Sequence, residues 1–186
     1  GNGGSAADAQ HIAAEFINRF QVERAPLAAL ALTTDTSVIT SIGNDYHFDE
    51  IFAKQIRALG KKDDIAIGIS TSGNSGNVIR AMEAANEMGI FTMGFTGQGG
   101  RLSECADMVF CVKSDRTARI QESHITLGHI LCDLVERILF PQAPPTYSEP
   151  LKTGCMRGAS GQTSEPAWCG CSWALRPRQP PASPSG

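Results

Sequence analysis

The stretch DIAIGISTSGNSGN, residues 64 to 77, decides the fold of this chain. The run DIAIGIS predicts a buried strand over 64–70. The Gly- and Ser-rich turn after it leads into an amphipathic helix over about 76–88. A continuously apolar strand followed at once by a helix is typical of a parallel sheet covered on both faces.

The same order of strand and helix continues on both sides of this stretch. Further strands are predicted over 27–32 (LAALAL), 91–96 (FTMGFT) and 108–112 (MVFCV). Helices are predicted over 5–20, 48–59, 101–106 and 117–139. The apolar face of the last helix is predicted to comprise Ile120, Leu127, Ile130, Leu131, Leu134, Val135 and Ile138. The fold class is therefore α/β, and ligands are expected where the carboxyl ends of strands meet the amino ends of helices.

The chain of 186 residues divides into two regions near residue 141. Residues 1–140 form the predicted domain. Residues 141–186 hold nine of the ten prolines and predict an extended or disordered Pro-, Gly- and Ser-rich tail. The Gly-rich turn at residues 1–4 is expected to follow a strand, so the domain's N-terminal helices and first strand are expected to be missing from this sequence.

The composition is that of a soluble globular protein, with 41% hydrophobic and 19% charged residues and a net charge of −3. This charge gives no reason to expect a nucleic-acid or membrane partner. No apolar run approaches the roughly 20 residues that span a bilayer. Cys105, Cys111 and Cys132 are isolated and predict reduced, buried thiols, which favours a cytoplasmic location.

Four hydroxyl side chains gather in the turn after the strand at 64–70, and they belong to Ser70, Thr71, Ser72 and Ser75. A helix N-terminus offers free N–H groups and a partial positive charge, which together with hydroxyl donors suit a phosphate. The turn lacks the Lys of a P-loop, so a nucleoside triphosphate is not expected. The plainer alternative is an ordinary capped helix.

The opening GNGGSA also matches the dinucleotide fingerprint G-x-G-x-x-A. That fingerprint requires an acidic residue at the end of the second strand, about 20 positions on. Glu23 lies near that distance but ahead of the predicted strand at 27–32. The match therefore gives little support to NAD binding.

A possible metal set spreads over the first and last predicted helices. His11 and Glu15 are four residues apart and share a helix face, and Gln121 and His129 are two turns apart on the last helix. Each has an ordinary explanation alone, but together they form a possible His₂-Glu-Gln site. His124 is predicted to lie behind this set or on the surface. Asp35 is predicted as a helix N-cap rather than as a substrate contact.

Four motifs in order resemble the phosphoheptose isomerase family of the sugar isomerase (SIS) superfamily. They are GNGGSAADAQHIAAEF, LTTDTSVITSIGNDY, GISTSGNSGNVIRAMEAA and TARIQESHITLGHILCDLVE. The resemblance covers about residues 1–140. It implies a flavodoxin-like three-layer α/β/α sandwich. The implied activity converts sedoheptulose 7-phosphate to D-glycero-D-manno-heptose 7-phosphate through an enediol, for bacterial heptose and lipopolysaccharide synthesis.

The same resemblance implies roles for individual residues. The substrate-binding residues would be Asn2, Gly3, Gly4, Ser5, Glu15, Asn44, Asp45, Ser70, Thr71, Ser72, Ser75 and Gln121. One Zn²⁺ per subunit would be held by His11, Glu15, Gln121 and His129. Glu15 would act as the base and His129 as the acid. Members of the family are homotetramers with active sites at subunit contacts.

Two alternatives of other classes stay open. One is a non-catalytic scaffold resembling the DnaA initiator-associating protein, and the other is a sugar-phosphate-sensing domain. The scaffold is expected to lack the acid–base pair, whereas Glu15 and His129 are both present here. The enzyme is therefore the favoured interpretation.

Overall fold

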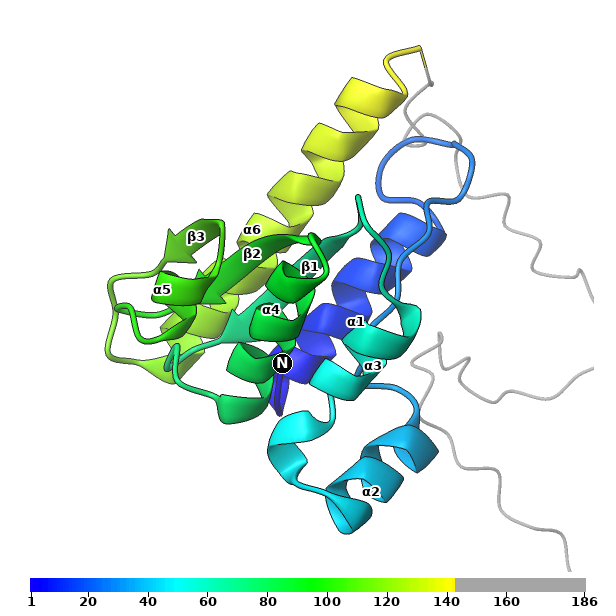
Figure 1. Cartoon of the computed structure of the whole chain (residues 1–186). Helices are drawn as coiled ribbons and strands as arrows, with labels where there is room; N and C mark the ends of the chain where they lie inside the picture. The colour runs from blue at the N-terminus through cyan, green and yellow to red at the C-terminus, as the bar shows by residue number, and fades with distance from the viewer. Residues whose placement is uncertain (143–186) are drawn as a thin grey trace, which may run out of the picture. The chain divides into compact units, whose positions relative to one another are not determined.

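The computed structural model describes residues 1–142, shown in Figure 1. The predicted tail lies outside the described residues except for its first two positions. The helices are α1 (Gly4–Ile17), α2 (Thr36–Asp45), the 3₁₀ helix η1 (Phe48–Glu50), α3 (Ala53–Leu59), α4 (Gly76–Glu87), α5 (Leu102–Cys105) and α6 (Thr117–Leu139). The strands are β1 (Ile65–Ser70), β2 (Phe91–Thr96) and β3 (Met108–Cys111).

The three strands form a parallel sheet in the order β1-β2-β3. Helices α4 and α5 make the two crossovers between consecutive strands. The register pairs Ser70 with Thr96, and Thr96 with Cys111, so the carboxyl ends of all three strands meet at one edge. Ser70, which begins the Ser/Gly-rich turn, lies at that edge.

Helices cover both faces of the sheet. One core cluster joins α4 and α5 through Val78, Met82 and Leu102. The other joins α1 and α6 to the sheet through Ile12, Ile69, Phe95 and Cys132. The predicted three-layer α/β/α arrangement is therefore confirmed.

Helices α1 and α6 lie side by side and run in the same direction. Gly4 contacts Gln121 near their starts, and Phe20, just after α1, contacts Glu136 near the end of α6. Between these points the helices approach closely at Gly128, where a Cβ atom would lie 2.7 Å from Cδ1 of Ile12. This close approach brings two distant parts of the sequence together.

The strand predicted over 27–32 is wrong. This segment joins no strand of the sheet, and Leu30 is 62% exposed while Ala31 is buried. A strand is stable only when a neighbour satisfies its backbone groups. Among the described residues the segment pairs with no strand, and the sheet is limited to β1, β2 and β3.

Two helix predictions also need correction. The helix predicted over 48–59 is divided into η1 and α3, with the buried residues Ile51 and Phe52 between them. On α6 the buried residues recur every fourth position at Ile120, His124, Gly128, Cys132 and Glu136. Three of the predicted apolar positions, Ile130, Leu134 and Ile138, are instead exposed.

The N-cap prediction for Asp35 is confirmed, because its carboxylate accepts a hydrogen bond from the Val38 N–H at 2.9 Å at the start of α2.

The three cysteines of the domain are free, as predicted. Cys132 is buried and Cys105 is half-buried, but Cys111 is exposed. The prediction of burial is therefore wrong for Cys111, which ends the edge strand β3.

Candidate functional site

The Ser/Gly-rich turn gathers three hydroxyl groups at the carboxyl end of β1. The Oγ atom of Ser70 lies 2.9 Å from that of Ser75 and 3.4 Å from that of Ser72. Gly73 has φ +67°, and any Cβ atom there would overlap the Gly99 carbonyl oxygen. Only glycine fits this position, which lets the turn pass tightly beneath the 97–100 loop.

The turn ends at the N-terminus of α4. Ser75 is the N-cap residue, and its side chain makes no capping hydrogen bond. Thr71 is half-buried and Ser72 is exposed in the same turn. Hydroxyl groups and the first N–H groups of a twelve-residue helix therefore face one region, an arrangement suited to a phosphate.

The Gly-rich turn at the start of the chain meets this region. The side-chain amides of Asn2 and Asn77 exchange two hydrogen bonds, at 2.8 and 2.9 Å. Gly3, with φ +53°, is the N-cap of α1, and Ser5 is buried in its first turn. Asn77 was not singled out from the sequence, although its place in the first turn of α4 was a usable signal.

Three of the four predicted metal ligands lie together on α1 and α6. Nε2 of His11 is 3.1 Å from Oε1 of Glu15 and 3.5 Å from Nε2 of His129. One ligand atom from each of these residues lies within 4.8 Å of the other two. His11 is exposed, and the other two are half-buried. We call these three residues the His-Glu-His triad.

Two of the three separations within the triad are close to those of a tetrahedral metal site. Ligand atoms about 2.0–2.1 Å from a tetrahedral Zn²⁺ ion lie about 3.3–3.4 Å from one another. The two separations of 3.1 and 3.5 Å bracket this value. Imidazole nitrogens and a carboxylate oxygen are also donors that zinc binds in proteins.

The other predicted site residues are placed differently. The Gln121 side chain lies against Gly4, where an added Cβ atom would meet its amide, so Gln121 is seated beside the Gly-rich turn. Asn44 and Asp45 are exposed at the end of α2, and the hydrogen bond of their side chains is to each other, at 2.8 Å. Helix α2 packs mainly on η1, so the described residues do not bring this pair to the triad.

Two polar side chains with buried atoms, Asp8 on α1 and His124 on α6, lie on the helices that carry the triad. His124 is fully buried, and its Nε2 lies 3.1 Å from the Thr96 carbonyl oxygen, which only accepts, so Nε2 carries the proton. Its Nδ1 and Oδ2 of Asp8 are buried without a hydrogen-bond partner among residues 1–142. Burial lowers the pKa of His124 and raises that of Asp8, while each charge partly offsets the other's shift. The sequence predicted His124 either behind the metal set or on the surface, and its burial excludes the surface.

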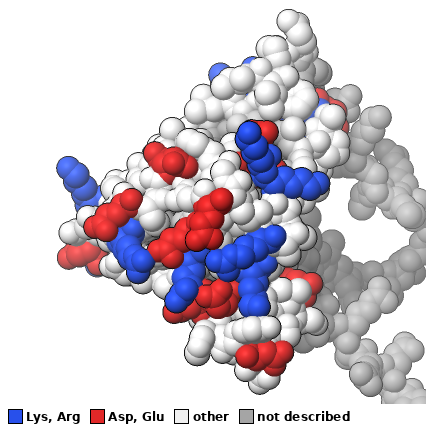
Figure 2. Space-filling model, in the orientation of Figure 1, with Lys and Arg blue, Asp and Glu red and all other residues white. Residues whose placement is uncertain are grey.

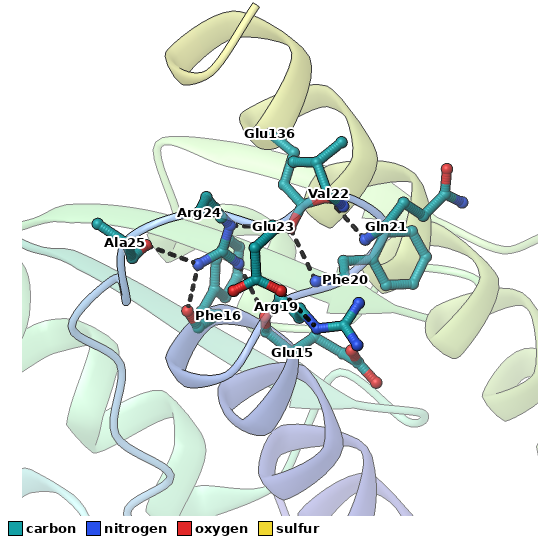
Figure 3. Close-up of polar contacts among 10 residues, drawn as sticks. All are labelled: Glu15, Phe16, Arg19, Phe20, Gln21, Val22, Glu23, Arg24, Ala25 and Glu136. Atoms are coloured by element: carbon teal, nitrogen blue, oxygen red, sulfur yellow. Dashed lines mark hydrogen bonds and ion pairs between the residues drawn. The ribbon is translucent and has the colours of Figure 1, made fainter. Parts of the chain in front are cut away.

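A second polar cluster, which the sequence did not reveal, joins the end of α1 to α6. Oε1 of Glu136 accepts hydrogen bonds from the Phe20 N–H and from Nε of Arg24 (Figure 3). Its Oε2 accepts from the N–H groups of Gln21 and Val22. The Glu136 and Arg24 side chains are only 2% and 1% exposed. No sequence signal marked this pair, because its burial depends on the contact between α1 and α6.

The surface in Figure 2 carries mixed charge, with basic and acidic side chains interspersed over the face shown. Ion pairs of the described chain include Arg80–Glu50 at 3.2 Å and Arg101–Glu83 at 2.6 Å. Among residues 1–142, no helix is long and apolar enough to cross a membrane.

Comparisons with known proteins agree with one another. The family described as SIS domain matches residues 1–97. The chain is 64% identical over 141 residues to a phosphoheptose isomerase of Nitratidesulfovibrio vulgaris (strain Hildenborough), covering 75% of this chain and 68% of that protein. It is 59% identical over 140 residues to the phosphoheptose isomerase of Aquifex aeolicus, covering 75% and 73%.

Solved structures show the same likeness. A phosphoheptose isomerase from Neisseria gonorrhoeae superposes with a TM-score of 0.69 at 53% identity. One from Francisella tularensis gives 0.70 at 44% identity. In both cases the match covers 73% of each chain.

Proposed function

The chain belongs to the phosphoheptose isomerase family of SIS-domain proteins, and from that membership we infer that it is an aldose–ketose isomerase. Its reaction converts sedoheptulose 7-phosphate to D-glycero-D-manno-heptose 7-phosphate, the first step of bacterial heptose synthesis. The observation that carries this proposal is the His-Glu-His triad, where one atom each of the proposed base Glu15, the proposed acid His129 and His11 lie within 4.8 Å of one another.

The two candidate subsites support a phosphorylated sugar as the substrate. The hydroxyl groups of Ser70, Ser72 and Ser75 would hold the phosphate, with Thr71 in the same turn. Asn2, Gly3, Gly4 and Ser5 would close over the sugar beside them. Seven helical residues, about 10 Å, separate Gly4, in the turn proposed to close over the sugar, from His11 in the triad.

The reaction moves a proton between two neighbouring carbons. Glu15 would remove a proton from C1 of the ketose, which gives an enediol, and return it to C2. His129 would move a proton between the two oxygens as the carbonyl shifts from C2 to C1. Each acid–base group of this kind typically contributes about 10²–10⁴-fold to the rate. The phosphate contacts would fix the orientation of the reacting carbons.

We assign the metal site to His11, Glu15 and His129, and the ion to Zn²⁺, one per subunit. Gln121, whose side chain lies beside Gly4, is proposed as a further ligand. A bound zinc ion would supply Lewis-acid polarisation of the substrate oxygens.

The exposed apolar side chains of α6 support an oligomer, because Ile130, Leu134 and Ile138 are 49%, 46% and 73% exposed. We propose a homotetramer with active sites at subunit contacts, where Asn44 and Asp45 would reach the sugar of a neighbouring subunit. The proposed binding partners are a sugar phosphate and further copies of the chain. Neither a nucleic acid nor a membrane is proposed as a partner. The proposed location is the cytoplasm, and residues 141–186 are proposed to be a tail outside the catalytic domain.

Conversion of sedoheptulose 7-phosphate in the presence of Zn²⁺, followed by NMR, tests this function. Glu15→Gln removes the base and is expected to lower turnover by about 10²–10⁴-fold. Asp133→Asn on the outer side of α6 is the control and is expected to leave turnover unchanged. Binding of the sugar phosphate without turnover by the unmodified chain would favour the scaffold or sensor instead.

A further inference from the structure

Glu136 and Arg24 form a buried ion pair that the reaction described above does not use. Their side chains are 2% and 1% exposed, with Nε of Arg24 2.8 Å from Oε1 of Glu136. The other ion pairs in the same region are solvated. Arg19–Glu23 is 40% and 73% exposed, and Arg137–Asp133 is 72% and 29% exposed. Surface pairs of that kind contribute little, whereas a buried pair persists only when every polar atom is satisfied.

The Glu136 carboxylate is fully satisfied. Its two oxygens accept four hydrogen bonds of 2.7–3.0 Å, three from the backbone N–H groups of residues 20–22 and one from Arg24. Burial alone would raise the pKa of Glu136, but these four donors together hold it below its ordinary value. The carboxylate is therefore ionised, and it fixes the loop that follows α1 against α6.

Arg24 connects this carboxylate to the backbone of Glu15. Its Nη2 donates to the Glu15 carbonyl oxygen at 2.9 Å, and its Nη1 donates to the Phe16 carbonyl oxygen at 2.9 Å (Figure 3). These carbonyl groups belong to the last turn of α1, where a helix has no partners of its own for them. Arg24 thus fixes the helical turn from which the Glu15 side chain projects toward the triad.

Phe20 connects the same carboxylate to His129. The Phe20 N–H donates to Glu136 at 2.7 Å, and the Phe20 ring stacks on the His129 ring with centroids 5.4 Å apart and planes 24° apart. His129 also precedes Glu136 by seven residues, two turns of α6, so both side chains lie on the same helix face. One buried carboxylate therefore supports both proposed acid–base residues.

We propose that Glu136 and Arg24 are positioning residues that set the separation of Glu15 and His129 and so the metal affinity and turnover of the triad. This inference rests on the proposed function. Glu15 lies on α1 and His129 on α6, so the distance between the proposed base and acid depends on how these two helices pack. The buried pair joins those helices one to two turns beyond the triad. Supporting groups of this kind typically change metal affinity or activity by 10–100-fold when removed.

The test compares Glu136→Gln and Arg24→Lys with the unmodified chain. Glutamine keeps the shape of Glu136 but replaces one acceptor with a donor that faces backbone N–H groups or Arg24. Lysine keeps the charge of Arg24 but cannot span the carboxylate and two carbonyl groups at once. Asp133→Asn and Glu23→Gln are the matched controls, since they break exposed ion pairs beside the same helix and loop.

Two readouts separate positioning from mere stability. Co²⁺ or Zn²⁺ affinity, measured by competition with a chelator, is expected to fall about 10–100-fold in both test variants. Turnover is expected to fall about 10–100-fold with KM for the sugar phosphate within about threefold, because the phosphate-binding turn is untouched. The controls are expected to match the unmodified chain in both readouts. A folded Glu136→Gln protein with unchanged metal affinity and turnover would overturn the proposal.

A further variant keeps the test decisive if the two charge variants do not fold. Phe20→Leu removes the ring that stacks on His129 but keeps the N–H that donates to Glu136. It is expected to lower metal affinity and turnover, while its thermal midpoint stays close to that of the unmodified chain. Unchanged metal affinity and turnover in this variant would contradict the proposal. Failure of the proposed function would look different. The unmodified chain would not convert the substrate, while the substitutions of Glu136 and Arg24 would still lower metal affinity.

Discussion

Nε2 of His11 lies 3.5 Å from Nε2 of His129, although 118 positions separate the two residues. Both rings present the same nitrogen to one point, where Oε1 of Glu15 also lies 3.1 Å from His11. At this distance the N–H of one ring can donate to the bare nitrogen of the other, or a cation can lie between two bare nitrogens. A divalent cation bound at this point would also be held by the Glu15 carboxylate.

Zinc is expected to stabilise the folded chain through this site. At a free Zn²⁺ concentration of 100 times Kd, the free energy of unfolding should rise by about 2.7 kcal/mol. His129→Gln should remove most of this gain, and Ser123→Ala, an exposed change on the same helix, should keep it. Thermal denaturation with and without chelator measures the effect, and equal midpoints for the unmodified chain in both conditions would count against a metal site.

Removal of a hydroxyl from the Ser/Gly-rich turn is expected to weaken substrate binding. Ser75→Ala removes the partner of Ser70 and a donor to the proposed phosphate, and hydrogen bonds to charged groups contribute about 1.5–3 kcal/mol. KM should therefore rise about 10–100-fold with a smaller change in kcat. Ser123→Ala is the matched control. Unchanged steady-state KM in Ser75→Ala would place the phosphate elsewhere.

Glu136 is expected to make stability depend on acid pH. Its pKa is lower in the folded chain than the ordinary value of 4.5, so its contribution is fully present above pH 4.5 and is lost as the pH falls through the folded pKa. Glu136→Gln, which leaves Arg24 buried without its counter-charge, should cost about 3–5 kcal/mol at pH 7. Urea unfolding should show that the difference in unfolding free energy between the unmodified chain and Glu136→Gln shrinks below pH 4.5. A difference that stays constant with pH would mean that the ionised carboxylate of Glu136 does not stabilise the fold.

The close approach of α1 and α6 is expected to exclude any side chain at position 128. In Gly128→Ala the new Cβ would lie 2.7 Å from Cδ1 of Ile12, and overpacking of this kind costs about 1–3 kcal/mol. The gain in helix propensity, about 1 kcal/mol, offsets only part of this cost. Urea unfolding should show a net loss of stability, accompanied by weaker metal binding.

Gly43→Ala on α2 is the control for this prediction, because an added Cβ there meets nothing within 4 Å. It should stabilise the chain by about 0.5–1 kcal/mol. The double variant Gly128→Ala, Ile12→Val should recover part of the loss, since valine lacks the Cδ1 atom. A stabilised Gly128→Ala protein would show that the two helices can separate without cost.

The elements whose pattern lies within a single segment could be predicted from the sequence. The apolar run at 65–70 indicates a strand, and the amphipathic spacing after it indicates a helix. The triad could likewise be assembled from His11 and Glu15 on one predicted helix and His129 on another. The segment 27–32 was mispredicted because apolar character favours a strand, whereas pairing depends on a neighbour that lies elsewhere.

The buried pair was missed for a related reason. Arg24 and Glu136 look like solvated charges, since one lies in a loop and the other on an outwardly ordinary helix. Their burial depends on the contact between α1 and α6, which no local pattern encodes. The buried stripe on α6, with its His and Glu positions, likewise differs from the apolar stripe that hydrophobicity alone indicates.

The pairing of the first and last helices also sets when the site can exist during synthesis. A ribosome adds about 5–20 residues per second, so the 118 positions between His11 and His129 take about 6–24 s to make. Over that interval the nascent chain carries His11 and Glu15 without their partner ring, and α1 lacks the helix on which it packs. The site is therefore completed only when α6 emerges and packs on α1 and the sheet.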